Sequence, residues 1–349
     1  MRRVRRRAGP VGLVLAVAVL LAPSAFPMAS AAFSATTTDA GNMVSSGQVA
    51  PPTDLAVSRT CTPSATITFR SATTAGGIDS LVLARPAGTV AGDVLVAQVI
   101  NRGGEQGGLQ VPAGWTQLTR VVSVNVAGTS SVLWRVATAG DPASWTFAIT
   151  TPASAQMVGG MAAYGGVSTT DPINISGSAT GATATATTPS IATTVANTRL
   201  LHLFAKREDL PAPAATSQRW RVITGPIGAT AGSTLADEPF AGPGATPARS
   251  TTTGVATEWV AHAVALRPIP GTPTANLTWA ASSTPSAEGY TLERLVGATL
   301  EATKPVTPIT ATATSDGPLV NGTTYTFRLR AYQGTWNSTV ATATFTPSC

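Results

Sequence analysis

Beyond its N-terminal segment, the chain is built from short runs in which apolar and polar residues alternate, and this pattern restricts it to β-structure. Alternation places every second side chain on one face of a strand, whereas an amphipathic helix needs apolar residues three and four positions apart. Clear runs are Asp93–Val99, Ser131–Val136, Ser144–Ile149 and Arg199–Phe204. Turn-forming residues, drawn from 33 glycines and 26 prolines, separate them. We therefore predict an all-β protein made of antiparallel sandwiches.

The N-terminus has the order of a secretory signal peptide. Arginines dominate residues 2–7, an apolar run extends from Val11 to Leu21, and Ala29-Ser30-Ala31 supplies small residues for cleavage. A membrane anchor is the alternative, but the apolar run is shorter than the roughly 20 residues that span a bilayer. We predict a signal peptide at 1–31, a flexible segment at 32–50, and a mature protein that is secreted, extracellular or attached to the cell surface, with no membrane partner.

The net charge argues against a nucleic-acid partner once this leader is removed. The whole chain has 22 basic and 16 acidic residues, a formal charge of +6. Five of the arginines lie in residues 2–7, which leaves 17 basic against 16 acidic residues and a net charge of about +1. Binding to nucleic acid depends on a concentrated positive surface, which a chain so nearly neutral does not provide.

The leader and the residues after it, Ala32–Asn42, resemble the start of bacterial secreted proteins of the biofilm-fibre and camelysin type. The resemblance covers about the first fifty residues, and it implies the export route. Camelysin-like proteins have been classed as metallopeptidases. This sequence contains no H-E-x-x-H motif, so the activity does not carry over.

The C-terminal part resembles a fibronectin type III domain. Leu319–Ala331 matches the L-x-x-G-T-x-Y-x-F-x-V-x-A stretch of that family, and Leu277–Trp279 and Gly289–Arg294 read as its strands B and C. The resemblance covers 273–349. It implies a β-sandwich in which Trp279 points inward and the hydroxyl of Tyr325 bonds to nearby backbone as a tyrosine corner.

The first strand of this domain is missing from its expected place and is found far upstream. Pro51–Ser58 resembles the family's P-x-x-L-x-V strand A, so we assign 51–62 to the same sandwich. Strands A and G lie close together in the family, which implies a disulfide between Cys61 and Cys349 to close the split frame. An exported chain permits that bond. Two free thiols or an intermolecular link are the alternatives.

The intervening residues, 64–268, are predicted to form a larger inserted β-sandwich. Ala65–Arg70 and Trp259–Arg267 read as its first and last strands, and we expect them to pair because insertions succeed where the inserted ends are adjacent. Gly92–Ala97, the Pro112-x-Gly-Trp turn and Ala163–Val167 resemble a jelly-roll-like module of bacterial secreted and tail-fibre-like proteins. That module supplies no catalytic residue, so the resemblance concerns the fold.

Few residues suggest chemistry, and we predict no catalytic residue, metal site or cofactor. His202 and His262, the only histidines, lie in apolar runs and read as core residues. Asp209 with Asp237 or Glu238 is the one carboxylate combination that would suit glycoside hydrolysis; solvated loop charges are the simpler interpretation. Three further acids begin turns, where capping explains them before calcium does. They are Asp93, Asp141 and Asp171.

Two tryptophans are candidates for binding. Trp220 is flanked by arginines and Trp336 lies in a Gly-Thr-Trp-Asn loop, so either ring could stack on a sugar; burial against its own sheet is the alternative. Four other tryptophans alternate with polar residues and read as core. They are Trp134, Trp145, Trp259 and Trp279.

These features favour a secreted, non-catalytic binding or adhesion protein, a monomer whose partner is a polysaccharide or a cell-surface protein. Two alternatives stay open. A glycoside hydrolase or its accessory module fits because fibronectin type III domains often accompany secreted polysaccharide-degrading enzymes. A structural subunit of an extracellular fibre fits the leader.

Overall fold

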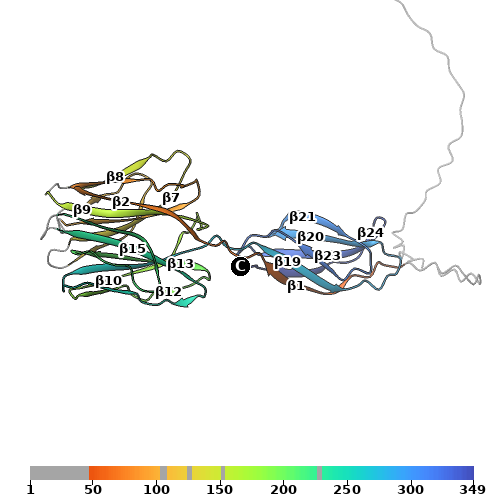
Figure 1. Cartoon of the computed structure of the whole chain (residues 1–349). Helices are drawn as coiled ribbons and strands as arrows, with labels where there is room; N and C mark the ends of the chain where they lie inside the picture. Colours follow the sequence, from red (N-terminus) through yellow and green to blue (C-terminus); the bar gives the residue numbers. More distant parts are fainter. Residues whose placement is uncertain (1–46, 103–107, 124–127, 151–153, 226–229) are drawn as a thin grey trace, which may run out of the picture. The chain divides into compact units, whose positions relative to one another are not determined.

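The computed structural model describes residues 47–102, 108–123, 128–150, 154–225 and 230–349, and every regular element in these ranges is a β-strand or β-bridge (Figure 1). The predicted signal peptide at 1–31 and nearly all of the predicted flexible segment at 32–50 lie outside the described residues. Within the described part of the chain, no helix is long and apolar enough to cross a membrane. The all-β prediction is confirmed.

The C-terminal residues form a fibronectin type III-like sandwich of two antiparallel sheets. One sheet has the order β1-β19-β22, and the other has the order β21-β20-β23, with β24 and β25 both pairing with β23. The strands are β1 Thr53–Cys61, β19 Pro273–Ala280, β20 Gly289–Val296, β21 Thr299–Val306, β22 Ala313–Asp316, β23 Tyr325–Gln333, β24 Trp336–Asn337 and β25 Ala341–Phe345.

The split of this sandwich is confirmed by the pairing of β1. This strand lies more than 200 residues before its neighbour and pairs with β19 from Thr53–Ala280 to Cys61–Pro273. Val49 is buried in the same core. Because Val49 packs there and the Ala50 N–H donates to the Thr284 hydroxyl at 2.8 Å, the ordered domain begins inside the segment predicted to be flexible.

Alternating residues of β23 fill the core of this sandwich, as the sequence pattern predicts. Trp279 and Tyr290 are buried and pack edge to face, with ring centres 5.3 Å apart. The Tyr325 hydroxyl accepts a hydrogen bond from the Val320 N–H at 3.0 Å, which is the expected tyrosine corner. The disulfide Cys61–Cys349 is present and joins β1 to the chain end beyond β25.

The inserted residues contain two central five-stranded antiparallel sheets. The first has the order β2-β9-β4-β7-β6, and the second has the order β10-β18-β13-β15-β14. The strands of the first are β2 Thr68–Ile78, β4 Val94–Asn101, β6 Thr116–Val122, β7 Thr129–Val136 and β9 Gln156–Gly165. Those of the second are β10 Ile173–Gly181, β13 Thr198–Lys206, β14 Ser217–Thr224, β15 Ala231–Phe240 and β18 Trp259–Leu266.

These two sheets have the same strand order, so the insert is a structural duplication. In each, the first strand of the half pairs with its last strand, which is β9 or β18, and this last strand pairs on its other side with β4 or β13. That inner strand pairs with β7 or β15, which pairs in turn with the strand before it, β6 or β14. The outer faces are covered by smaller sheets that again join the second strand of each half to its second-to-last. These are β3-β8-β5 in the first half and β11-β17 and β12-β16 in the second.

The outer strands are short. They are β3 Ser80–Ala84, β5 Leu109–Gln110, β8 Ser144–Ile149, β11 Thr185–Thr187, β12 Ala192–Thr193, β16 Gly244–Ala245 and β17 Ser250–Thr252. Separate apolar clusters lie between each central sheet and its outer cover, and a third lies between the two central sheets. The larger inserted β-structure thus has four layers, with the two central sheets packed on each other. The jelly-roll assignment itself stays a prediction.

The expected pairing of the insert's first and last strands is wrong. β2 pairs with β9 in the first central sheet, whereas β18 pairs with β10 and β13 in the second. The connecting segments pair instead: the Ala65 N–H donates to the Ile269 carbonyl at 2.9 Å, and the Thr62 N–H donates to the Thr272 carbonyl at 3.0 Å. The two ends of the insert are thus adjacent, but its first strand, β2, belongs to one central sheet and its last strand, β18, belongs to the other.

Candidate functional site

Trp336 is the exposed aromatic residue of the described chain, and it lies at the tip of a tight hairpin. Its side chain is 62% exposed, and no other Trp, Tyr or Phe is classed as exposed in the described ranges. Gln333 of β23 pairs with Trp336 of β24, so only Gly334 and Thr335 form the turn. Gly334 has a φ of 57°, which a residue without a Cβ adopts at little cost. The Trp336 ring therefore projects from a hairpin with a two-residue turn.

The neighbouring loop between β19 and β20 holds this hairpin in place. The Gly334 N–H donates to Glu288 Oε1 at 2.9 Å, and the Ser286 hydroxyl donates to Gln333 Oε1 at 3.2 Å. Asn337 follows the ring directly and is exposed. An exposed indole with amide and hydroxyl groups beside it can contact the apolar face of a sugar and bond to its hydroxyl groups.

Trp220 does not offer such a surface, and its place among the binding candidates is corrected. It is 4% exposed and belongs to the cluster between the two central sheets. Its Nε1–H donates to the Ser233 hydroxyl at 2.9 Å. The ring lies against Gly160 of β9, where an added Cβ would come within 2.5 Å of it. The flanking arginines suggested that Trp220 is exposed. The sequence does not show that the other central sheet covers the face of β14 from which Trp220 projects.

The remaining tryptophans are buried or half-buried. Trp134 packs at the edge of the cluster between the central sheets; Trp115, Trp145, Trp259 and Trp279 are buried. Trp145 also holds a cation: the Arg135 guanidinium lies 4.9 Å from its ring centre and bonds to Asp141 at 2.5 Å. The core interpretation of Trp145, Trp259 and Trp279 agrees with these positions.

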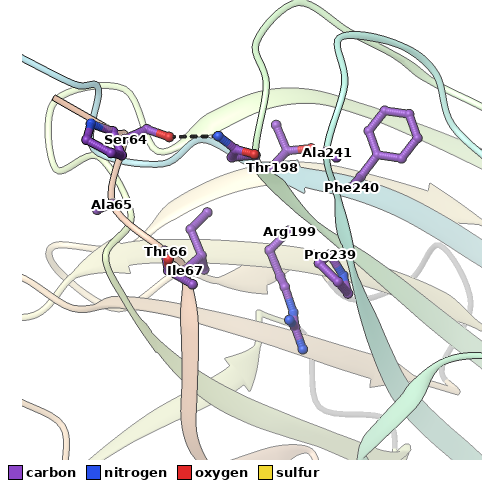
Figure 2. Close-up of a pocket in the computed structure, with 11 residues that line it drawn as sticks. Ser64, Ala65, Thr66, Ile67, Thr198, Arg199, Pro239, Phe240 and Ala241 are labelled. Atoms are coloured by element: carbon purple, nitrogen blue, oxygen red, sulfur yellow. Dashed lines mark hydrogen bonds between the residues drawn. The ribbon is translucent and has the colours of Figure 1, made fainter. Parts of the chain in front are cut away.

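A pocket of about 390 Å³ lies in the insert, where the segment leading into β2 meets the start of β13 and the end of β15 (Figure 2). Its wall combines apolar groups, including Ile67 and Phe240, with the polar groups of Ser64 and Arg199. Ser64 accepts a hydrogen bond from Asn197 Nδ2 at 3.0 Å across one side. The sequence analysis missed this site because its parts come from three distant segments, and only Phe240, two residues after an acidic pair, hinted at it.

Asp237 lies behind this pocket in a buried charge cluster. It accepts hydrogen bonds or ion pairs from Arg199 at 2.5 Å, Arg219 at 2.8 Å and the Tyr164 hydroxyl at 2.9 Å. Burial and the neighbouring carboxylate raise the pKa of Tyr164 well above its ordinary value, so the phenol stays a donor. The Arg219 guanidinium also covers the Phe69 ring at 4.3 Å.

Glu238 follows Asp237 on the same strand and therefore points to the opposite face of the sheet. There it accepts two hydrogen bonds from Arg249, at 2.8 and 2.5 Å, and contacts His202 Nε2 at 3.0 Å. Asp209, the third acid of the predicted combination, forms a bidentate pair with Arg221 at 2.6 Å. Each of the three acids is therefore paired with an arginine, and Asp237 and Glu238 lie on opposite faces of β15. None of these contacts joins Asp209 to Asp237 or to Glu238, the combination that the sequence offered for glycoside hydrolysis.

Thr188, His202 and Glu238 form a line that resembles a nucleophile, base and acid. His202 Nδ1 lies 3.0 Å from the Thr188 hydroxyl. Both side chains are enclosed, with Thr188 at 0% and His202 at 1% exposure, and Thr188 also bonds to the Arg249 backbone. Burial lowers the pKa of His202, while the contact with Glu238 opposes that shift. Because both side chains are enclosed, a substrate could not reach them in this arrangement, and we assign the three residues to the packing of the outer layer.

His262 is also a core residue, as predicted, and lies between the central sheets at 0% exposure. The three acids at turn starts bond to nearby groups: Asp93 to Arg70 at 2.6 Å, Asp141 to Arg135, and Asp171 to Arg267 at 3.0 Å. Among the described residues, no group of three or more His, Cys, Asp or Glu side chains is arranged to hold a metal ion.

No protein-family model and no curated protein matches the sequence. Among solved structures, the FN1-FN3 domains of chicken CNTN1 share 10% identity over 82% of this chain and 99% of theirs, with a TM-score of 0.20. A crystal structure of domains from titin shares 12% identity over 86% of this chain and 99% of its own, with a TM-score of 0.18. The fibronectin type III-like assignment of the frame follows from its strand order and its tyrosine corner.

Proposed function

We propose that this chain is a secreted, non-catalytic adhesion protein that binds polysaccharide through the Trp336 hairpin of its fibronectin type III-like domain. The exposure of Trp336 carries the proposal. A large aromatic ring at 62% exposure gains free energy when a ligand covers it, because most of its surface takes no part in the packing of its own domain. Gln333 and Asn337 beside the ring offer amide groups to the hydroxyl groups of a sugar unit, and the Glu288 carboxylate of the neighbouring loop bonds to the Gly334 N–H.

The acids of the insert support a binding protein over a hydrolase. A general acid or base must reach its substrate with a suitable pKa. Burial works against ionisation of Glu238, but hydrogen bonds from Arg249 and His202 outweigh it and lower the pKa of the carboxyl, which is the wrong direction for a general acid. The export route and the disulfide-closed frame both fit an extracellular location.

The test is binding of the mature protein to purified wall and matrix polysaccharides, comparing Trp336→Ala with Val320→Ala. Val320 is a matched control because it is an apolar residue that is 64% exposed. It lies before the start of β23, whereas Trp336 follows the end of that strand. Loss of an aromatic contact predicts a fall in polysaccharide affinity of about tenfold or more for Trp336→Ala. Val320→Ala should bind as the wild type does, and both variants should unfold within about 0.5 kcal/mol of it.

Unchanged affinity in Trp336→Ala would remove the hairpin from the proposal. Binding to a purified cell-surface protein but to no polysaccharide fraction, with loss in Trp336→Ala, would keep the site and overturn the ligand class. Release of sugar from any polysaccharide, abolished by Glu238→Gln, would replace the proposal by a hydrolase.

A further inference from the structure

The pocket in Figure 2 has a charge balance that points to an anionic ligand. Arg199 is the one charged residue in its lining, and no acid lines it. Behind it, the single carboxylate of Asp237 serves both Arg199 and Arg219. Of the acids in salt bridges between described residues, Asp237 alone is shared by two arginines. Since Tyr164 stays neutral, the cluster carries one positive charge in excess.

This excess charge is costly where it lies. The side chains of Arg199 and Arg219 are 15% and 19% exposed, and Asp237 is 0% exposed, so water screens the cluster poorly. An anion that enters from the pocket gains the interaction with Arg199 that Asp237 only half supplies. A carboxylate suits a guanidinium best because both are planar and can form paired hydrogen bonds.

The wall of the pocket also contains polar atoms without a partner. Thr198 is 2% exposed, and its hydroxyl has no hydrogen-bond partner among the described residues; the same is true of Arg199 Nε. Buried groups of this kind cost free energy until something bonds to them. A carboxylate beside the guanidinium could bond to Arg199 Nε, whereas the Thr198 side chain points to the opposite face of β13.

The apolar part of the wall fixes the rest of the ligand. Pro239 comes from the end of β15 and is the register partner of Arg199, and Ile67 lies in the segment entering β2. Phe240 lines the pocket from the opposite face of the sheet, where it packs against the outer layer. A ring with one apolar face and several hydroxyl groups matches a wall that combines these side chains with Ser64 and Asn197. The volume of about 390 Å³ falls in the range of about 300–1,000 Å³ that small-molecule sites occupy.

We propose that this pocket binds a carboxylated sugar, such as a uronic acid unit of an acidic polysaccharide, with the carboxylate toward Arg199 and the ring against Pro239 and Ile67. The proposal rests on the polysaccharide-binding function proposed above and adds a second, charge-selective subsite to it. The pocket lies at the seam of the two halves of the insert, since β2 belongs to one and β13 and β15 to the other. The duplication thus creates a site that neither half contains alone.

The test uses methyl glucuronide and methyl galacturonide as probes, with the neutral methyl glucoside and galactoside as matched controls, in titrations of isotopically labelled mature protein followed by NMR. The uronides should shift the amide signals of residues 64–67, 197–199 and 240–241, and their affinity should fall as salt is raised. The neutral glycosides should bind at least about tenfold more weakly. Ala241→Trp, which places a large ring at the pocket's rim, should abolish the shifts.

Ala84→Trp is the control for that variant, because Ala84 is exposed on the outer sheet of the other half and should leave uronide binding unchanged. Arg199→Gln should lose the salt dependence and about tenfold in affinity; if it fails to fold, Ala241→Trp decides. Equal binding of uronides and neutral glycosides, uronide shifts that persist in Ala241→Trp, or no uronide binding would each overturn the inference. Polysaccharide binding through Trp336 is measured separately with Trp336→Ala, so the subsite and the hairpin can fail independently.

Discussion

At the scale of single residues, Lys206 shows how the insert uses a buried charge. Its side chain is enclosed, and its Nζ donates to the carbonyls of Thr183 at 3.2 Å, Ala184 at 3.1 Å and Val255 at 2.9 Å, and to the Thr253 hydroxyl at 2.5 Å. Glu208 lies 3.8 Å away. The ammonium is therefore surrounded by oxygen atoms, much as a bound metal cation would be. Its hydrogen bonds join the loop before β11 to the loop after β17.

Lys206→Met should lower the free energy of unfolding by about 3 kcal/mol, because three carbonyls and a hydroxyl lose their donor while the apolar stem is kept. Urea unfolding measures this loss, and hydrogen exchange should show faster exchange in residues 183–185 and 252–255. Lys304→Met, at the chain's other lysine, is the control: its Nζ bonds to Thr314 and Ser315 at a half-exposed position, so a cost below about 1 kcal/mol is expected. Equal costs for the two variants would contradict the assigned role.

At the scale of elements, the two central sheets are joined by a chain of buried polar side chains. The Gln98 amide of β4 donates to the Ser130 hydroxyl and accepts from the Ser233 hydroxyl of β15, at 3.0 and 2.8 Å. Ser130 lies 3.0 Å from His262 Nε2, and Ser178 lies 2.8 Å from His262 Nδ1. These contacts fix how the two halves meet, because a shift of one strand position would leave several buried groups unpaired.

Burial lowers the pKa of His262 to about 4. Its unfolded-state pKa is near 6.5, so the unfolded chain binds more protons between these two values. Stability should therefore be complete above pH 6.5 and fall as the pH drops toward 4, by roughly 3 kcal/mol from this residue. Denaturant unfolding of wild type and His262→Gln at several pH values isolates the effect. His202 shifts in the same direction and remains in both proteins, so the difference between them reports His262.

A wild-type protein whose stability relative to His262→Gln does not change between pH 7 and pH 4 would show that His262 is not held neutral by the core. A difference that grows as pH falls, with His262→Gln becoming relatively more stable, is the expected result. Acidic groups titrate in this range as well, but they are common to both proteins.

At the scale of the whole molecule, the insert and the split frame have separate cores. The fibronectin type III-like core includes β1 and β19–β25, whereas the insert's clusters contain residues of β2–β18. The disulfide joins the two ends of the frame across a sequence separation of 288 residues. Because the Ala65 N–H contacts the Ile269 carbonyl, a folded insert shortens that loop to roughly 80 residues, from Ile269 to Cys349.

Cys349→Ser should destabilise the frame by about 4–5 kcal/mol in the chain-entropy model and leave the insert folded. Calorimetry should show one transition moving to lower temperature while a second stays in place, and hydrogen exchange should assign the shifted transition to β1 and β19–β25. Wild-type protein treated with reductant is the control and should behave as the variant does. A single transition that shifts as a whole would refute the independence of the two parts.

The sequence by itself determined the β-class, the split frame, the disulfide and the tyrosine corner. Alternation in β23 and the Gly-Thr-x-Tyr stretch are local patterns. Residues such as Tyr325 and Phe327 therefore indicate the strand and the tyrosine corner without knowledge of the rest of the fold. The hairpin of Trp336 was also predictable as a loop, because Gly334 sits at its turn.

Which faces of the strands are covered depends on the tertiary structure. Trp220 and Trp336 both have polar neighbours in the sequence, yet Trp220 is buried under another sheet and Trp336 is exposed. β4 and β18 are buried on both faces, so their residues do not mark one buried face. The duplication appears in the order of the strands, and similar residues in the two halves do not reveal it. The pocket beside Arg199 and the sharing of Asp237 by two arginines arise from segments far apart in the chain. Long-range packing brings such groups together, and the local pattern of residues does not show which distant segments will meet.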